Sequence, residues 1–183
     1  MSATDPRPAL HVMAAVIRGH DGRILIARRA PNADQGGLWE FPGGKREAGE
    51  SREEALHREL EEELGIRVQR ATPLLQVTHD YPARRVLLDV FEVTAWEGAP
   101  HGREGQPLAW VEPERLREYA FPAANLPIVT AARLPRLCLV TPQPVGPSDV
   151  AWFARLEAAL AAGVRLVQLR APGLSEAEYA TLA

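Results

Sequence analysis

The sequence predicts an α/β protein, in which helices cover a sheet. Two β-prone runs joined by an Asp-Gly pair come first, an acidic helix with a leucine stripe follows, and the C-terminal part alternates strand and helix. Of the 183 residues, 46% are hydrophobic and 25% are charged, so the chain can form a packed core.

The first expected elements are the two strands of a hairpin. Residues 10–18 and 23–28 are apolar, and Asp21-Gly22 between them is typical of a tight turn. Proline and glycine recur through residues 31–49, which are therefore predicted to be a loop.

A helix is predicted from Ser51 to Leu64. Ser51 and Glu54 fit a capping box, and Gly65 is placed to end the helix. Leucines recur every four residues and predict one buried stripe: Leu56, Leu60 and Leu64. Further strands are expected at 74–78, 86–94 and 108–111, a helical turn at 113–119 and a second helix at 122–133.

A βαβα pattern begins after Leu134-Pro135. It comprises a strand at 137–141, a Pro/Gly-rich loop, a helix at 149–162, a strand at 164–170 and a helical start at Ser175. This order is typical of a parallel α/β domain, but two parallel strands leave open sheet edges. We therefore expect two domains, 1–134 and 135–183, with the second one truncated.

Charge and composition exclude several function classes. The net charge of −3 and the pI of about 6.0 give no broad basic surface for a nucleic acid polymer. No apolar run reaches the roughly 18 residues of a membrane span, and the first residues lack a leader pattern. The lone Cys138 excludes an internal disulfide, and its apolar neighbours predict a small core residue. We expect a cytoplasmic protein without a membrane partner; the oligomeric state stays open.

The predicted helix is densely acidic. Seven glutamates lie between Glu50 and Glu63, opposed only by Arg52 and Arg58. A solvated helix face is the ordinary explanation of such a run and suits Glu61. Three other acids share an arc of about 100° beside the leucine stripe, where like charges destabilise a helix: Glu59, Glu62 and Glu63.

A divalent cation would relieve this repulsion. Mg²⁺ prefers hard oxygen ligands, including those of phosphates, and we expect Mn²⁺ to substitute for it. The Gly43-Gly44 turn lets the backbone approach, so a main-chain carbonyl could add a ligand. A cation held in this way would also bind the phosphate oxygens of a substrate.

Residues 44–66, GKREAGESREEALHRELEEELGI, resemble the Nudix box at every defined position. The resemblance implies an α/β/α sandwich with a mixed central sheet, and cleavage of nucleoside diphosphates linked to another group. It also implies a set of metal ligands, a supporting ion pair between Glu50 and Arg58, and a carboxylate base whose identity stays open. The implied ligands are Glu59, Glu62, Glu63 and the carbonyl of Gly43.

From residue 10 to about 133 the chain is also similar to MutT-type pyrophosphohydrolases, which remove 8-oxo-dGTP. The similar segments are Ala27–Arg29, Leu38–Lys45, Trp96–Trp110 and Phe121–Ile128. The similarity implies that Glu104 is a further metal ligand or base, and that Asn125 reads the oxidised purine. Three more residues match positions that contact the nucleotide: Arg29, Phe41 and Arg84. Arg85 is an alternative to Arg84.

Some of these assignments have ordinary structural alternatives. The Asn125 amide offers a donor and an acceptor to a purine edge, but an asparagine before Leu126-Pro127 could also cap a helix. Phe41 and Trp39 could stack on a base, although large aromatic residues more often belong to a core.

Residues 136–183 resemble the opening of thiamine phosphate synthase and its TenI-like relatives, which are (β/α)₈ barrels. The resemblance implies that Gln168 and Arg170 lie at the C-terminal end of a strand, where barrel sites lie. Pro172 stands where a lysine usually follows. A quarter of a barrel cannot close its sheet, so we expect no synthase activity.

The sequence thus favours one function over two others. The first is Mg²⁺-dependent hydrolysis of 8-oxo-dGTP to 8-oxo-dGMP and pyrophosphate, which sanitises the nucleotide pool and avoids mutation. The second is Nudix hydrolysis of another nucleoside triphosphate or of a thiamine-pathway pyrophosphate. The third is a non-catalytic module that senses a nucleotide, and the complete acidic set argues against it.

Overall fold

The computed structural model describes residues 9–144 and 148–182. The chain divides into two compact units, one ending at Arg133 and the other beginning at Leu134. The assignment of residues 1–134 and 135–183 to two named domain types stays a prediction. Within the described ranges, no helix combines the length and the apolar character that a membrane crossing requires.

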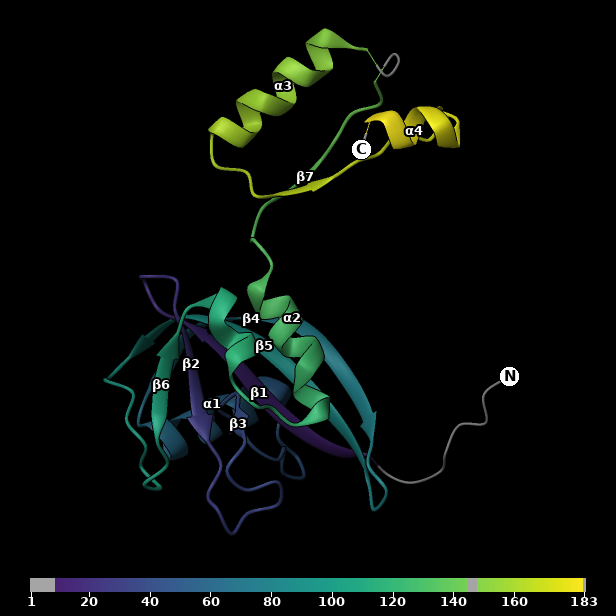
Figure 1. Cartoon of the computed structure of the whole chain (residues 1–183). Helices are drawn as coiled ribbons and strands as arrows, with labels where there is room; N and C mark the ends of the chain where they lie inside the picture. The colour runs from purple at the N-terminus through teal and green to yellow at the C-terminus, as the bar shows by residue number, and fades with distance from the viewer. Residues whose placement is uncertain (1–8, 145–147, 183) are drawn as a thin grey trace. The chain divides into compact units, whose positions relative to one another are not determined.

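The first unit is built on a six-stranded mixed sheet (Figure 1). Its strands are β1 (Leu10–Arg18), β2 (Ile24–Arg28), β3 (Trp39–Glu40), β4 (Arg67–Asp80), β5 (Arg85–Glu97) and β6 (Leu108–Val111). The order across the sheet is β3-β2-β1-β5-β4, and β6 also pairs with β2. The strands β1 and β5 run parallel, whereas the other pairs are antiparallel. The expected mixed central sheet is confirmed.

Local signals explain the hairpin and the acidic helix. Ile17 pairs with Leu25 across the turn, and Gly22 has the positive φ of 84° that the Asp-Gly pair predicts. Helix α1 (Arg52–Leu64) begins with the expected capping box, in which the Ser51 hydroxyl accepts a hydrogen bond from the Glu54 N–H at 3.1 Å. The Glu54 carboxylate accepts one from the Ser51 N–H at 2.7 Å in return.

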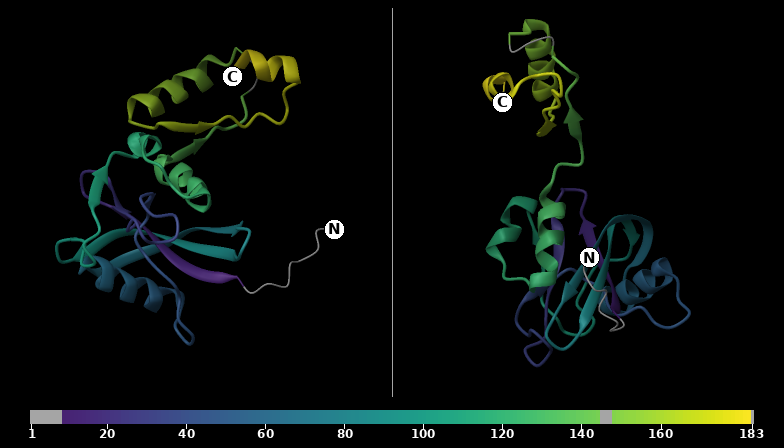
Figure 2. Two further views of the ribbon diagram at one scale, coloured as in Figure 1. Left: turned by 60° about the horizontal axis from the view of Figure 1, so that its bottom comes forward. Right: turned by 90° about the vertical axis from the view of Figure 1, so that its right-hand side faces the viewer.

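Two apolar layers hold helices against opposite faces of the sheet. The three predicted leucines of α1 are completely buried and pack with Met13, Ile17 and Phe91. The other face is covered by the 3-10 helices η1 (Pro113–Glu118) and η2 (Ala123–Asn125) and by α2 (Leu126–Arg133). Figure 2 shows α1 on one side of the sheet and α2 on the other. The result is the expected α/β/α sandwich.

Several segments of the first unit differ from the prediction, and β5 extends to Glu97 instead of residue 94. Strand β4 begins at Arg67 instead of residue 74, because it is an edge strand held by long pairing with β5 and accommodates Pro73 at a register shift. Strand β3 interrupts the loop expected at 31–49. The helix expected at 122–133 begins as the 3-10 helix η2.

The second unit has the expected βαβα order. Its elements are β7 (Cys138–Val140), α3 (Val150–Ala161), β8 (Leu166–Gln168) and α4 (Glu176–Leu182), and β7 and β8 run parallel. Residues 145–147 of the predicted Pro/Gly-rich loop lie outside the described residues. Gln168 ends β8, and the Arg170 N–H beyond it donates to the Thr141 hydroxyl at 2.9 Å. The resemblance of this unit to a barrel opening stays a prediction.

Cys138 is exposed, so the prediction of a core residue is wrong. Alternate residues of a strand face opposite sides of a sheet, and Cys138 shares its exposed side with Val140, whereas Leu139 is half-buried. An apolar run alone does not tell which side of a strand is covered.

Candidate active site

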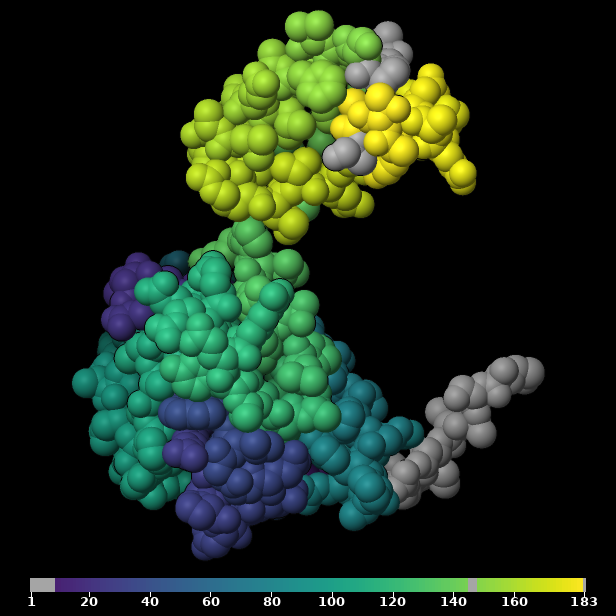
Figure 3. Space-filling view, viewed as in Figure 1, coloured from purple at the N-terminus to yellow at the C-terminus, as the bar shows by residue number. Residues whose placement is uncertain are grey.

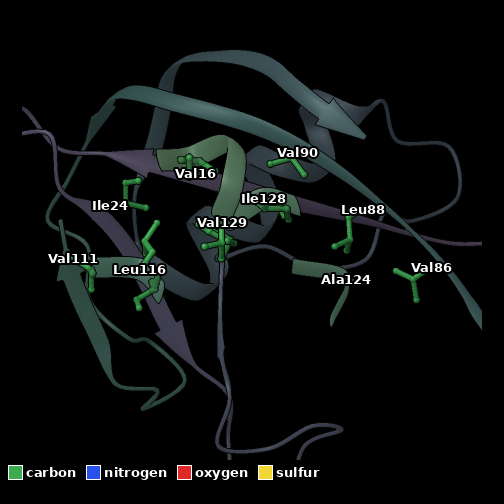
Figure 4. Close-up of a cluster of buried hydrophobic side chains, with 14 residues drawn as sticks. Val16, Ile24, Val86, Leu88, Val90, Val111, Leu116, Ala124, Ile128 and Val129 are labelled. Carbon is green, nitrogen blue, oxygen red and sulfur yellow. The ribbon is translucent and has the colours of Figure 1, made fainter. Parts of the chain in front are cut away.

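A cavity of about 630 Å³ lies in the first unit, a size that is ordinary for small-molecule sites. Its apolar wall comes from β1, from β5 and from the segment before α2, with Val12, Val86, Leu88 and Ala124 among its residues. Figure 4 shows Val86, Leu88 and Ala124 at one end of a buried cluster, away from Val111. Polar residues from four loops complete the lining.

The Gly43-Gly44 turn is fixed against β1. The Met13 N–H donates to the Gly44 carbonyl at 2.7 Å, and the Ala15 N–H donates to the Pro42 carbonyl at 2.8 Å. Gly43 has a φ of 140°, and a Cβ there would collide with the Met13 carbonyl. Between those two bonded carbonyls, the Gly43 carbonyl accepts no hydrogen bond from a described residue. It is therefore free to accept a ligand, as the predicted role requires.

Glu63 lies among other acids at the same turn. Its carboxylate accepts a hydrogen bond from the Gly43 N–H at 3.1 Å, and it lines the cavity together with Glu40 and Glu104. Burial raises the pKa of Glu63 to about 8, the Gly43 N–H opposes this rise, and the charges of Glu40, Glu59 and Glu104 add to it. Arg29 pairs with Glu40 and Arg58 pairs with Glu59, but no described arginine or lysine pairs with Glu63 or Glu104, so these hard oxygen donors fit a divalent cation such as Mg²⁺.

Glu104 reaches this group because the loop between β5 and β6 docks on the end of α1. The Glu63 carbonyl accepts hydrogen bonds from the Arg103 N–H at 2.9 Å and from the Gln106 amide at 3.1 Å. The same Gln106 side chain accepts from the Glu104 N–H at 2.9 Å. These bonds place the predicted Glu104 beside the cavity.

The expected ion pair between Glu50 and Arg58 is present. Arg58 donates to the Glu50 carboxylate at 2.7 Å and to the Lys45 carbonyl at 3.0 Å, which ties the loop before α1 to the helix. The hydrogen bond from Arg58 holds the pKa of Glu50 at about 2. The same guanidinium donates to Glu59 at 2.9 Å and to Glu62 at 3.1 Å.

The predicted metal ligands lie near one another, but their side chains do not point to one common metal position. In the described parts of the chain, no three His, Cys, Asp or Glu side chains are placed to hold a metal ion as they lie. Glu62 is 59% exposed and does not line the cavity, whereas Glu59 rests against the backbone of Gly44. A shared cation therefore requires Glu59 and Glu62 to turn away from Arg58. Glu61 points to solvent, as predicted, and it pairs with Arg67.

All four residues expected to contact a nucleotide line the cavity: Arg29, Phe41, Arg84 and Asn125. Of the two adjacent arginines, Arg84 lines the cavity, whereas Arg85 donates to the Asp80 carboxylate at 2.6 Å. The Phe41 ring is 3% exposed and stacks on Phe121 with centroids 5.4 Å apart, so it belongs to the core as well as to the cavity wall.

Asn125 ends η2, where its N–H donates to the Pro122 carbonyl at 2.9 Å. Its side-chain amide bonds to none of the described residues, so it caps no described helix and remains available to a ligand. Trp39, the other aromatic candidate, packs edge-on against Tyr119.

Two acidic residues of the cavity were missed by sequence reasoning. Glu40 forms an ion pair with Arg29, and burial raises the pKa of its carboxyl while Arg29 opposes that rise. Asp34 forms an ion pair with Arg84. Both residues lie in the segment predicted to be a loop, and Glu40 directly precedes Phe41 in the segment Leu38–Lys45, which resembles MutT-type enzymes.

Comparisons with known proteins match the first unit. A family model described as the NUDIX domain matches residues 13–131. The 8-oxo-dGTP diphosphatase of Escherichia coli K12 is 41% identical over 70% of this chain and 98% of its own. The CTP pyrophosphohydrolase of the same strain is 38% identical over 67% of this chain and 90% of its own.

A solved structure from a study of MutT from Aliivibrio salmonicida and Vibrio cholerae is 43% identical. It covers 68% of this chain and 95% of its own, with a TM-score of 0.59. The family model thus covers more than half of the chain, and nearly whole relatives align with the unit that contains the cavity. The chain belongs to the NUDIX domain family of hydrolases.

Proposed function

We propose that the chain hydrolyses 8-oxo-dGTP with the help of Mg²⁺ and releases 8-oxo-dGMP, pyrophosphate and a proton. The observation that carries this proposal is one cavity that joins acidic residues to the Gly43 carbonyl and the Asn125 side-chain amide, neither of which bonds to any residue that the structure describes. Relatives named 8-oxo-dGTP diphosphatase support the substrate. A nucleotide pool in the cytoplasm is the setting that we infer.

The ion would be held by the Gly43 carbonyl and by the predicted acids Glu59, Glu62, Glu63 and Glu104, and Mn²⁺ would substitute. When bound, it neutralises phosphate charge and lowers the pKa of a bound water. One of the four carboxylates accepts the proton of the attacking water.

The supporting pair and the cavity wall position the reactants. Arg58, bonded to Glu50 and to the Lys45 carbonyl, holds the loop against α1 so that the Gly43 carbonyl stays next to the helix acids. The Asn125 amide supplies a donor and an acceptor to the edge of the oxidised purine. Phe41, fixed by Phe121, provides a rigid apolar contact for the base.

A second candidate substrate is CTP, because a relative named CTP pyrophosphohydrolase aligns over nearly the same residues. Its chemistry at the acidic group would be the same, and only the contacts of the base would differ. A thiamine-pathway pyrophosphate as substrate would rest solely on the resemblance of the second unit to a barrel opening. A silent sensing module would not need the complete acidic set.

Release of pyrophosphate from 8-oxo-dGTP, dGTP and CTP in the presence of Mg²⁺ tests the proposal. We expect kcat/KM for 8-oxo-dGTP to exceed that for the other two by at least about 100-fold, since recognition by hydrogen bonds discriminates strongly. Asn125→Ala should remove most of this preference, whereas Asn32→Ala, at an exposed residue outside the cavity lining, should preserve it. Equal turnover of dGTP and 8-oxo-dGTP would contradict the proposal, and preferred turnover of CTP would establish the second candidate.

A further inference from the structure

One loop residue, Asp34, contacts two of the arginines that line the cavity, Arg29 and Arg84. The Asp34 carbonyl accepts a hydrogen bond from Arg29 Nε at 2.8 Å, and the Asp34 carboxylate forms an ion pair with Arg84. All three residues line the cavity. The carboxylate of Asp34 is 59% exposed and Arg84 is 47% exposed, so this contact lies at the solvent-facing rim.

The two segments that Asp34 joins are each held by their own hydrogen bonds. In the β2–β3 loop, the Arg29 N–H donates to the Leu38 carbonyl at 2.9 Å, and the Gly37 N–H donates to the Arg29 carbonyl at 3.1 Å. In the β4–β5 turn, the N–H and the carbonyl of Arg84 both bond to Tyr81. Figure 3 shows the indigo loop beside the teal turn. Asp34 thus ties together two ordered segments that are far apart in the sequence.

Both arginines keep free donors. A guanidinium carries five N–H groups, and Arg29 uses only Nε for Asp34 and Nη1 for Glu40 among the described residues. Arg84 uses only Nη2 within the described residues. The remaining donors can bind an anionic or carbonyl group in the cavity without any change in the contacts that fix the two side chains.

We propose that Asp34 is a positioning residue for substrate binding, which holds Arg29 through its carbonyl and Arg84 through its carboxylate before the nucleotide arrives. This inference rests on the proposed function, because it assumes that a nucleotide occupies the cavity. Holding a binding group in place beforehand lowers the ordering cost of association. If Asp34 only competed with the substrate for Arg84, removing its charge would lower KM instead of raising it.

Asp34→Asn tests the proposal, since it removes the charge and keeps the size and the carbonyl. KM for the best nucleotide of the panel should rise about 2- to 5-fold with kcat unchanged, as expected for one exposed ion pair, and the rise should shrink at high salt. The added effect of Asp34→Asn should disappear in the Arg84→Gln background. Asp21→Asn, which breaks a similarly exposed pair with Arg23 outside the cavity, should leave KM unchanged.

Hydrogen exchange in the protein without nucleotide provides a readout that does not depend on the substrate. Amides of residues 29–38 and 81–84 should exchange faster in Asp34→Asn than in the unsubstituted protein. An unchanged KM, with or without faster exchange, would overturn the proposal, and so would a lower KM. If the unsubstituted protein hydrolyses no nucleotide, the proposed function fails, whereas the exchange result still reports whether Asp34 ties the two segments.

Discussion

Replacing Glu63 by glutamine is expected to lower kcat/KM for nucleotide hydrolysis by about 1,000-fold, or roughly 4 kcal/mol of transition-state stabilisation. Glutamine keeps the size of the side chain but lacks the negative charge at the centre of the acidic group. Pyrophosphate release at saturating Mg²⁺ measures the effect. Undiminished hydrolysis would remove Glu63 from the metal site.

Glu61→Gln is the matched control, because Glu61 lies on the same helix, faces solvent and pairs with Arg67. We expect it to change kcat/KM by less than about 2-fold.

A stability measurement on metal-free protein excludes misfolding of Glu63→Gln. With its pKa raised to about 8, Glu63 keeps a proton in the folded state that the unfolded chain releases near the ordinary glutamate pKa of 4.5. The stability that this proton contributes is complete below pH 4.5 and is lost as the pH rises towards 8. At pH 9 the folded protein must hold a buried, ionised Glu63, so Glu63→Gln should unfold at a higher urea concentration than the unsubstituted protein.

Asp89→Ala is expected to have the largest effect on stability, a loss of about 3–5 kcal/mol in the free energy of unfolding. Asp89 is completely buried beneath the start of α1. Its carboxylate accepts hydrogen bonds from Arg52 at 2.6 Å, Gln76 at 2.9 Å and His11 at 3.1 Å. Alanine would leave these three donors without their shared acceptor, and Arg52 would also lose the partner that holds it near the Phe91 ring. Urea denaturation monitored by tryptophan fluorescence measures the loss.

Asp21→Ala provides the comparison for this prediction. Asp21 is 50% exposed and pairs with Arg23 in the turn between β1 and β2. We expect its removal to leave the free energy of unfolding nearly unchanged, because solvent screens an exposed ion pair. Similar losses for the two variants would show that the buried contacts of Asp89 contribute little beyond those of an exposed ion pair.

Elements with local signals could be predicted from the sequence. The capping residues of α1, its leucine spacing and the Asp-Gly turn each act within a few residues, so they were readable without tertiary structure. Strand β4 was only partly predictable, because its start is mostly exposed and pairs with the far end of β5, from Arg67 with Glu97 onward. Its stability comes from that pairing and not from an apolar pattern of its own.

The residues of the candidate site also divide into those that a local sequence pattern predicts and those that depend on distant contacts. The Nudix box fixes the spacing of the helix acids, and the capped helix then places Glu63 beside the Gly43 turn. Glu40 was missed because β3 is a strand only through its pairing with Ala27 and Arg28. Asp34 was missed because its role depends on Arg84, which a distant turn brings to the same cavity. Contacts of this kind have no signature in a local window of sequence.

The central claim is that acids of α1 and the Gly43 carbonyl hold a divalent cation next to the nucleotide cavity. Anomalous diffraction from crystals soaked with Mn²⁺ and 8-oxo-dGMP tests it most directly. The account predicts a manganese peak at coordination distance from the Glu59 and Glu63 carboxylates and from the Gly43 carbonyl. A protein-bound peak away from these groups, or no peak at a Mn²⁺ concentration that supports hydrolysis, would contradict it.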